Sequence, residues 1–137
     1  MITSKITESP IFGALLAEEV SDEAAGAVVT FSGEVRNHDG GRNVQKLTYE
    51  VHPTAERMIK EIAEKVANKF EVIHVSVAHR FGPIPIGEVA FAVAVSAAHR
   101  KTAFECCEEL VERVKAELPI WKFQEFTDGT SEWVNSA

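Results

Sequence analysis

Apolar residues repeat at three- and four-residue spacing in two long stretches of the chain, and this spacing predicts two amphipathic helices. The first covers residues 53–70. The second covers residues 99–118 and ends there because Pro119 cannot continue a helix. A shorter helix is expected over residues 10–20. The predicted core faces of the long helices are Ala55, Met58, Ile59, Ile62, Ala63, Val66, Ala67 and Phe70, and Ala103, Phe104, Cys107, Leu110, Val111, Val114 and Leu118.

Segments rich in β-branched and aromatic residues predict the strands. They lie at residues 2–8, 27–33, 44–51, 72–81 and 89–96, and a last strand follows Pro119. The strand at 89–96 is apolar on both faces, which is typical of a central strand. We expect a mobile polar loop at 34–43, a packing or partner surface at the apolar loop 82–87, and an acidic tail after the last strand.

The element order β-α-β-β-α-β-β-α-β predicts an α+β fold in which a mixed sheet packs against helices. The 137 residues are expected to form one domain, 1–137. A net charge of -7 disfavours nucleic-acid and anionic-membrane binding. No apolar run reaches transmembrane length and the N-terminus lacks a signal-peptide pattern, so the expected location is the cytoplasm.

Neither a metal nor a cofactor is expected. The two cysteines, Cys106 and Cys107, are neighbours on a predicted helix and point about 100° apart, which disfavours a disulfide between them. Cys107 is expected in the core. The five histidines show no ligand spacing with each other or with cysteine.

Two lysines flank the break at Pro119. Lys115 lies at the edge of the helix's apolar face, one turn after Val111, and Lys122 lies on the following strand, on the face opposite Trp121. Two ammonium groups can therefore converge at a partly desolvated corner, where lost hydration and the like charge of Lys122 are expected to lower the pKa of Lys115. The alternative is a pair of surface lysines with apolar stems against the protein.

Further basic residues suggest an anion site. Arg36 opens the polar loop, and His99 and Arg100 fall in a first helical turn, where the macrodipole disfavours positive charge unless an anion compensates. The alternative is that these basic side chains extend into solvent and bind no anion. His79 and Arg80 are expected as a surface pair at a strand end. With no serine–histidine–acid order and no glycine-rich phosphate loop, an enzyme of this sequence would use lysine and arginine on an anionic, phosphorylated substrate.

Four blocks of the sequence stand out together: Phe31-Ser32-Gly33-Glu34-Val35-Arg36-Asn37-His38, Leu47-Thr48-Tyr49-Glu50, Ser96-Ala97-Ala98-His99-Arg100 with Ala103-Phe104, and Lys115 through Pro119-Ile120-Trp121-Lys122. In their order and spacing, these blocks resemble the large, catalytic subunit of molybdopterin synthase. The resemblance implies an α/β-hammerhead fold and a homodimer. It also implies a small ubiquitin-like sulfur-carrier subunit at each end, giving a heterotetramer of two large and two small subunits.

The same resemblance implies the reaction. The partner's C-terminal Gly-Gly tail would carry a thiocarboxylate and enter a pocket of this subunit. Sulfur would pass from it to cyclic pyranopterin monophosphate, a pterin phosphate, to form the molybdopterin dithiolene. The enzyme would be a sulfurtransferase. The competing interpretation is a non-catalytic anion- or tail-binding α+β dimer module.

The resemblance also implies the site residues. Lys115 and Lys122 match the family's catalytic lysines. The implied substrate-binding residues are Glu34, Val35, Arg36, His99, Arg100, Lys115, Lys122, Phe123 and Gln124. Phe123 and Gln124 stand where the family often has a charged residue followed by Glu, which is a departure from its pattern.

Overall fold

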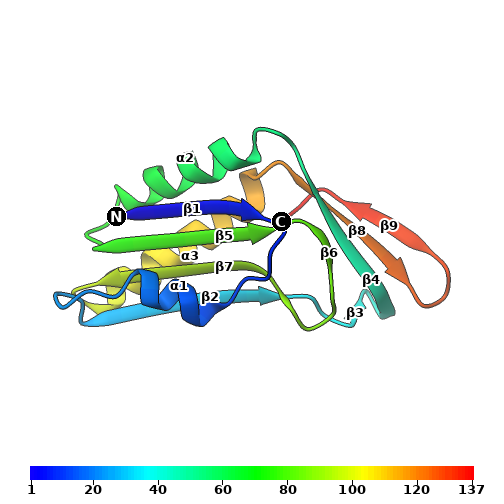
Figure 1. Ribbon diagram of the computed structural model, residues 1–137, viewed down its shortest axis with the longest axis horizontal. Helices are drawn as coiled ribbons and strands as arrows, with labels where there is room; N and C mark the ends of the chain where they lie inside the picture. Colours follow the sequence, from blue (N-terminus) through cyan, green and yellow to red (C-terminus); the bar gives the residue numbers. More distant parts are fainter.

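Two sheets lie next to each other along the long axis of the molecule (Figure 1). The computed structural model describes residues 1–137. The first sheet has the strand order β1-β5-β7-β2, in which β1 is parallel to β5 and the other neighbours are antiparallel. Its strands are β1 (Ile2–Thr7), β2 (Ala27–Glu34), β5 (His74–Arg80) and β7 (Val89–Ala97).

The second sheet is antiparallel and has the order β3-β4-β8-β9, with β6 also paired to β4. Its strands are β3 (His38–Asp39), β4 (Arg42–Val51), β6 (Gly82–Ile84), β8 (Ile120–Phe126) and β9 (Ser131–Val134). The chain enters this sheet from the ends of β2, β5 and α3, so the second sheet stands at one end of the first.

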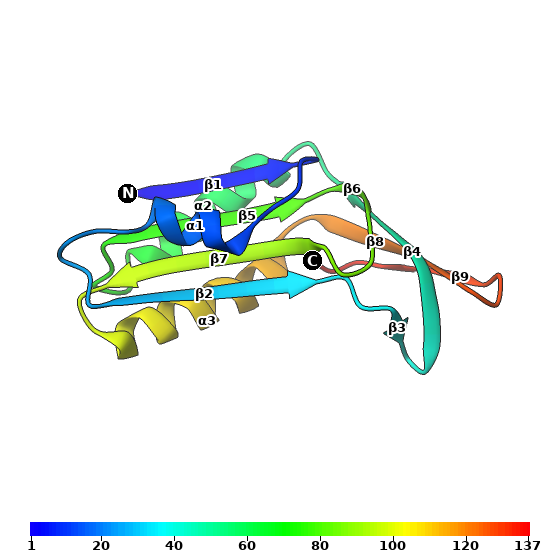
Figure 2. The same ribbon diagram turned by 60° about the horizontal axis from the view of Figure 1, so that its bottom comes forward.

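Helices α2 (Ala55–Ala67) and α3 (Arg100–Glu117) cover one face of the first sheet, and α1 (Gly13–Glu19) covers the other (Figure 2). Val93 and Val95 of β7 face the two long helices, whereas Ala92 and Ala94 pack with Leu16 of α1. Strand β7 lies between β5 and β2 and is buried on both faces, which confirms the predicted central strand. The predicted α+β fold is confirmed. None of the three helices is long and apolar enough to cross a membrane.

Three segments that were not expected to be strands pair with the second sheet. The segment predicted as a polar loop, 34–43, contains β3, which forms a hairpin with β4 through Gly40 and Gly41, both at positive φ. The apolar loop 82–87 begins with β6, and the expected acidic tail contains β9. These strands are short and lack an apolar alternation of their own, so only pairing with β4 and β8 makes them strands.

All three helices are shorter at both ends than predicted. Helix α1 spans Gly13–Glu19 instead of 10–20, α2 spans Ala55–Ala67 instead of 53–70, and α3 spans Arg100–Glu117 instead of 99–118. Phe104 was assigned to the core face of α3 but is 57% exposed, because it lies at the open edge of the first sheet, beside β2. Cys106, as well as Cys107, is buried.

We expect Gly26 to be required where β2 begins. Its N–H donates to the Ala97 carbonyl at 3.1 Å, and a Cβ at this position would overlap the Ala98 carbonyl oxygen. Gly26→Ala should therefore lower the free energy of unfolding by about 1–3 kcal/mol, measured by urea denaturation. Gly13→Ala is the matched control, since its Cβ would meet nothing closer than 4.0 Å. Equal stability of both variants would contradict the close approach.

Candidate active site

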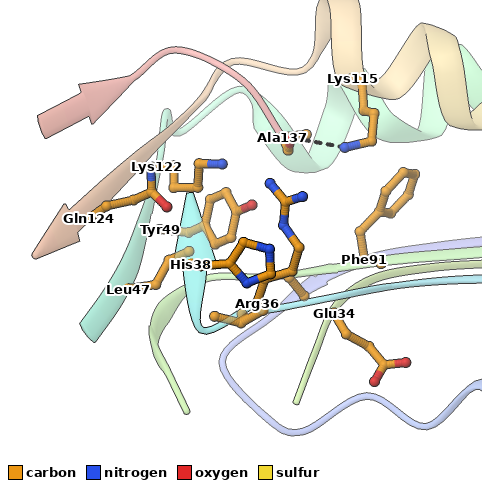
Figure 3. A pocket seen from close by; sticks show the side chains of 13 residues that line it. Glu34, Arg36, His38, Leu47, Tyr49, Phe91, Lys115, Lys122, Gln124 and Ala137 are labelled. Atoms are coloured by element: carbon orange, nitrogen blue, oxygen red, sulfur yellow. Dashed lines mark hydrogen bonds between the residues drawn. The ribbon is translucent and has the colours of Figure 1, made fainter. Parts of the chain in front are cut away.

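A cavity of about 210 Å³ opens where the two sheets meet (Figure 3). Its wall combines both sheets and a helix: Tyr49 comes from β4, Phe91 from β7, Lys115 from α3 and Lys122 from β8, and Arg36 follows β2. Figure 3 shows the two ammonium groups and the guanidinium directed into the same space. Three cations therefore face one cavity in a protein whose net charge is -7.

The end of α3 brings the lysines together. Lys115 lies in the last turn, and Leu118 has an extended backbone (φ -68, ψ 126) because Pro119 follows it. Strand β8 begins at the next residue and pairs with β4 so that Lys122 stands opposite Tyr49. The structure thus places both lysines on one cavity, as the sequence predicts.

Burial and charge change the acidity of Lys122. Its pKa is lowered first by burial, and the nearby charges of Lys115 and Arg36 lower it further, while Asp39 and Glu132 act in the opposite direction. Lys122 therefore gives up its proton more readily than a solvated lysine does.

Part of the cavity is filled by the chain itself. After β9 the chain runs on toward the place where the two sheets meet, and Ala137 is buried against the cavity wall. The ammonium of Lys115 donates to the Ala137 carbonyl oxygen at 3.3 Å, and the Ser136 hydroxyl donates to the same oxygen at 3.2 Å. The space beside Lys115 therefore accepts a backbone segment with a small side chain, and Lys115 binds its oxygen (Figure 3).

A fully buried histidine supports the aromatic wall. His79 stacks on Phe91 at 5.4 Å and meets Tyr49 edge-on at 4.9 Å, and its Nδ1 bonds to the Arg80 carbonyl at 2.8 Å. Burial lowers its pKa to about 4. The prediction of a surface pair at His79 and Arg80 is wrong: β5 is an inner strand, and Arg80 is buried in an ion pair with Glu88 at 2.8 Å.

The sequence and the fold match one family. The family model described as "MoaE protein" covers residues 6–117. The molybdopterin synthase catalytic subunit of Bacillus subtilis is 37% identical over 131 residues, which are 95% of this chain and 83% of the relative. The same-named protein of Neosartorya fischeri is 42% identical over 94% of this chain and 69% of its own length. The chain belongs to the MoaE family.

Solved structures agree with this assignment. The molybdopterin synthase structure from Staphylococcus aureus has a TM-score of 0.86 and 37% identity, over 94% of each chain. A structure described as a complex of subunits 1 and 2 of molybdopterin-converting factor from Helicobacter pylori has a TM-score of 0.75 and 25% identity, over 96% of this chain and 88% of that one. The resemblance stated from the motifs is confirmed, and with it the enzyme class of the MoaE family, a sulfurtransferase.

In this MoaE-family chain the expected site residues fall into two groups. Phe123 lies on the opposite face of β8, where it stacks on Trp133 at 4.7 Å. His99 and Arg100 are exposed at the first turn of α3, roughly 22 Å along the helix from Lys115 at 1.5 Å per residue. The other expected site residues all line the cavity: Glu34, Val35, Arg36, Lys115, Lys122 and Gln124.

Several residues of the cavity were not expected from the sequence. Leu47, Tyr49 and His38 stood in the motif blocks of the resemblance but were given no part in the site, and Phe91 carried no signal beyond its strand. Ala137 could not be expected, because its place depends on the path that the chain takes after β9.

We expect His79 to make stability depend on pH. The unfolded chain takes up the histidine proton near pH 6.5 and the folded protein near pH 4, so stability is complete above pH 6.5 and is lost as the pH falls toward 4. Between pH 7.5 and 4.5 the wild type should lose about 2–3 kcal/mol more unfolding free energy than His79→Phe, measured in urea. Equal losses in the two proteins would mean that His79 titrates normally in the fold.

Proposed function

We propose that this chain is the catalytic subunit of a molybdopterin synthase and transfers sulfur from a partner's thiocarboxylate to cyclic pyranopterin monophosphate. The observation that carries the proposal is the cavity in which Lys115 and Lys122 face Arg36, in a chain of the MoaE family. A phosphate-bearing substrate needs such cations, and a thiocarboxylate is itself an anion. A non-catalytic binding module would not need a lysine with a lowered pKa.

The partner is a small ubiquitin-like sulfur-carrier subunit with a Gly-Gly C-terminus. Lys115 already binds the backbone oxygen of Ala137, and the small side chain of that residue fits beside it. A Gly-Gly tail has no side chains to place there, so it can follow the same route once residues 135–137 have left. The relative from Helicobacter pylori, described as a complex of subunits 1 and 2, supports such a pairing.

The lysines have different parts in the reaction. Lys115 meets the partner's terminal group, where its ammonium stabilises negative charge, or where its amine attacks the thiocarboxylate carbon, forms an amide with the tail and releases the sulfur as hydrosulfide for transfer to the substrate. Lys122, with its lowered pKa, exchanges protons as the cyclic phosphate opens. Neither cysteine supplies the sulfur, because both are buried and burial raises the pKa of Cys106 to about 12 and of Cys107 to about 11.

A second copy of the chain completes the substrate site. His99 and Arg100 are too far from Lys115 to bind the same ligand within one chain. Ala27 at the start of β2 pairs with Ala97, close to Arg100, whereas the cavity lies at the other end of β2. If two β2 edges pair antiparallel about a twofold axis, the start of one β2 lies against the end of the other. His99 and Arg100 of one copy then approach the cavity of the other.

The free edge of β2 supports this homodimer. β2 is hydrogen-bonded to β7 only, so its other edge offers unpaired backbone groups. Val28 on this strand is 45% exposed, and Phe104 of α3 is exposed beside it. Two such dimer-related large subunits, each with a small subunit at its cavity, give the expected heterotetramer.

Replacement of Lys115 tests the reaction. Lys115→Ala should abolish dithiolene formation from cyclic pyranopterin monophosphate and the thiocarboxylated partner, with the fold unchanged by circular dichroism, because this side chain contributes little to the core. Lys115→Arg should be nearly as inactive, since a guanidinium stays protonated and cannot act as a nucleophile or base. Near-normal turnover of Lys115→Arg would reduce Lys115 to a fixed positive charge.

Mixing an inactive variant with a weakly binding one tests whether a second copy completes the site. Arg100→Ala should weaken substrate binding about 10- to 100-fold through loss of a charge-assisted contact. In a dimer of one Lys115→Ala and one Arg100→Ala chain, one site carries both changes and the other carries neither. Mixed dimers should therefore regain about half of the wild-type activity per dimer under subsaturating substrate. If all these residues act within one chain, mixing restores nothing.

A further inference from the structure

Gln124 presents an amide to the cavity from β8, and two carboxylates lie behind it. Its Nε2 donates to Asp39 Oδ2 at 2.8 Å and to Glu132 Oε1 at 3.4 Å. The carboxylates come from β3 and β9, so three strands of the second sheet meet at this side chain. Gln124 is only 3% exposed, although it lines the cavity.

The two carboxylates determine which way the amide faces. An ionised carboxylate only accepts hydrogen bonds, so the amide nitrogen has to face Asp39 and Glu132. The hydrogen bond from Gln124 lowers the pKa of Asp39 and keeps it ionised at neutral pH. Arg42 in turn donates to Glu132 at 2.8 Å and fixes its position. The opposite amide orientation would set a carbonyl oxygen against two anions and leave both without a donor.

The amide oxygen is left free for a ligand. It has no hydrogen-bond partner in the chain, and it is not sealed in the protein, since the one sealed and unpaired polar side-chain atom is Nε2 of His79. Figure 3 shows the Gln124 amide at the edge of the cavity with its oxygen turned toward the cavity. A neutral acceptor there can accept a hydrogen bond from an N–H group, which Lys115, Lys122 and Arg36 cannot do.

We propose that Gln124 is a specificity-determining residue that accepts a hydrogen bond from a ring N–H or amino group of the substrate's heterocycle, and that Asp39 and Glu132 are the residues that position it. The inference rests on the proposed function, because a pterin carries such donors at one end and a phosphate at the other. The cations then bind the phosphate, and the acceptor selects the heterocycle.

Asp39 also lies 3.5 Å from Arg36, so its removal should change the two parts of the site in opposite directions. Without Asp39 the Gln124 amide is free to turn, which weakens binding of the heterocycle. The Arg36 guanidinium loses a competing anion, which strengthens binding of phosphate. If Asp39 only reduced the positive charge of the cavity, its removal would not weaken binding of the heterocycle.

Two separate probes distinguish these effects, a phosphate-free pterin and inorganic phosphate, each titrated against the purified full chain in its assembled state. Gln124→Met should lower the affinity for the pterin about tenfold and leave the affinity for phosphate unchanged. Asp39→Ala should lower the affinity for the pterin several-fold and raise the affinity for phosphate. Asp128→Ala is the matched control: this exposed carboxylate bonds only to Thr130 in the β8–β9 turn, so neither affinity should change.

Pterin affinity unchanged in Gln124→Met, or tighter binding of both probes in Asp39→Ala, would overturn the inference. In the dithiolene assay Gln124→Met should raise KM for cyclic pyranopterin monophosphate about tenfold with little change in kcat, as for the loss of a uniform binding contact. A wild-type enzyme that turns over, with an unchanged KM in Gln124→Met, rejects this role and leaves the proposed function standing. A wild type that forms no dithiolene contradicts both.

Discussion

The hydrogen-bonded pairing of β8 with β4 is the interaction on which the cavity depends. Helix α3 ends at Glu117, and Pro119 forces the chain out of the helix direction within two residues. The strand that follows finds its partners along β4 from Val51 to Val44, and this ladder holds the second sheet against the end of the first. Lys115 is fixed by the helix and Lys122 by the ladder. Without that ladder the two lysines would belong to unconnected parts of the surface.

The electrostatics of the site follow from the same arrangement. The chain as a whole is acidic, yet the meeting of two sheets and a helix end gathers three cations around one cavity. Repulsion among them is limited by Asp39 and Glu132, which stand behind the cavity wall on β3 and β9. These carboxylates keep the cations close together without filling the space in front of them, which leaves room for an anionic ligand.

The cavity wall is built at some cost to stability. His79 is sealed between Phe91 and Tyr49 with one ring nitrogen unpaired, although an apolar side chain would avoid that loss. Helix α3 likewise has basic residues in its first turn, where the macrodipole opposes them. In the proposed dimer this second departure has a reason, because the first turn of one α3 faces the anion held by the other copy.

The sequence by itself determined the fold class, the two long helices, the central strand and the two lysines beside Pro119, because helical periodicity, strand alternation and a proline break are local properties. Motif order was sufficient for the family. Only the tertiary structure decided that β3, β6 and β9 are strands, since short segments without an apolar alternation of their own take that form through pairing with β4 and β8. Tertiary structure also buried His79, turned the Gln124 amide oxygen toward the cavity and separated Arg100 from Lys115 by the length of a helix. Each of these results depends on contacts between residues far apart in the chain, which local pattern does not encode.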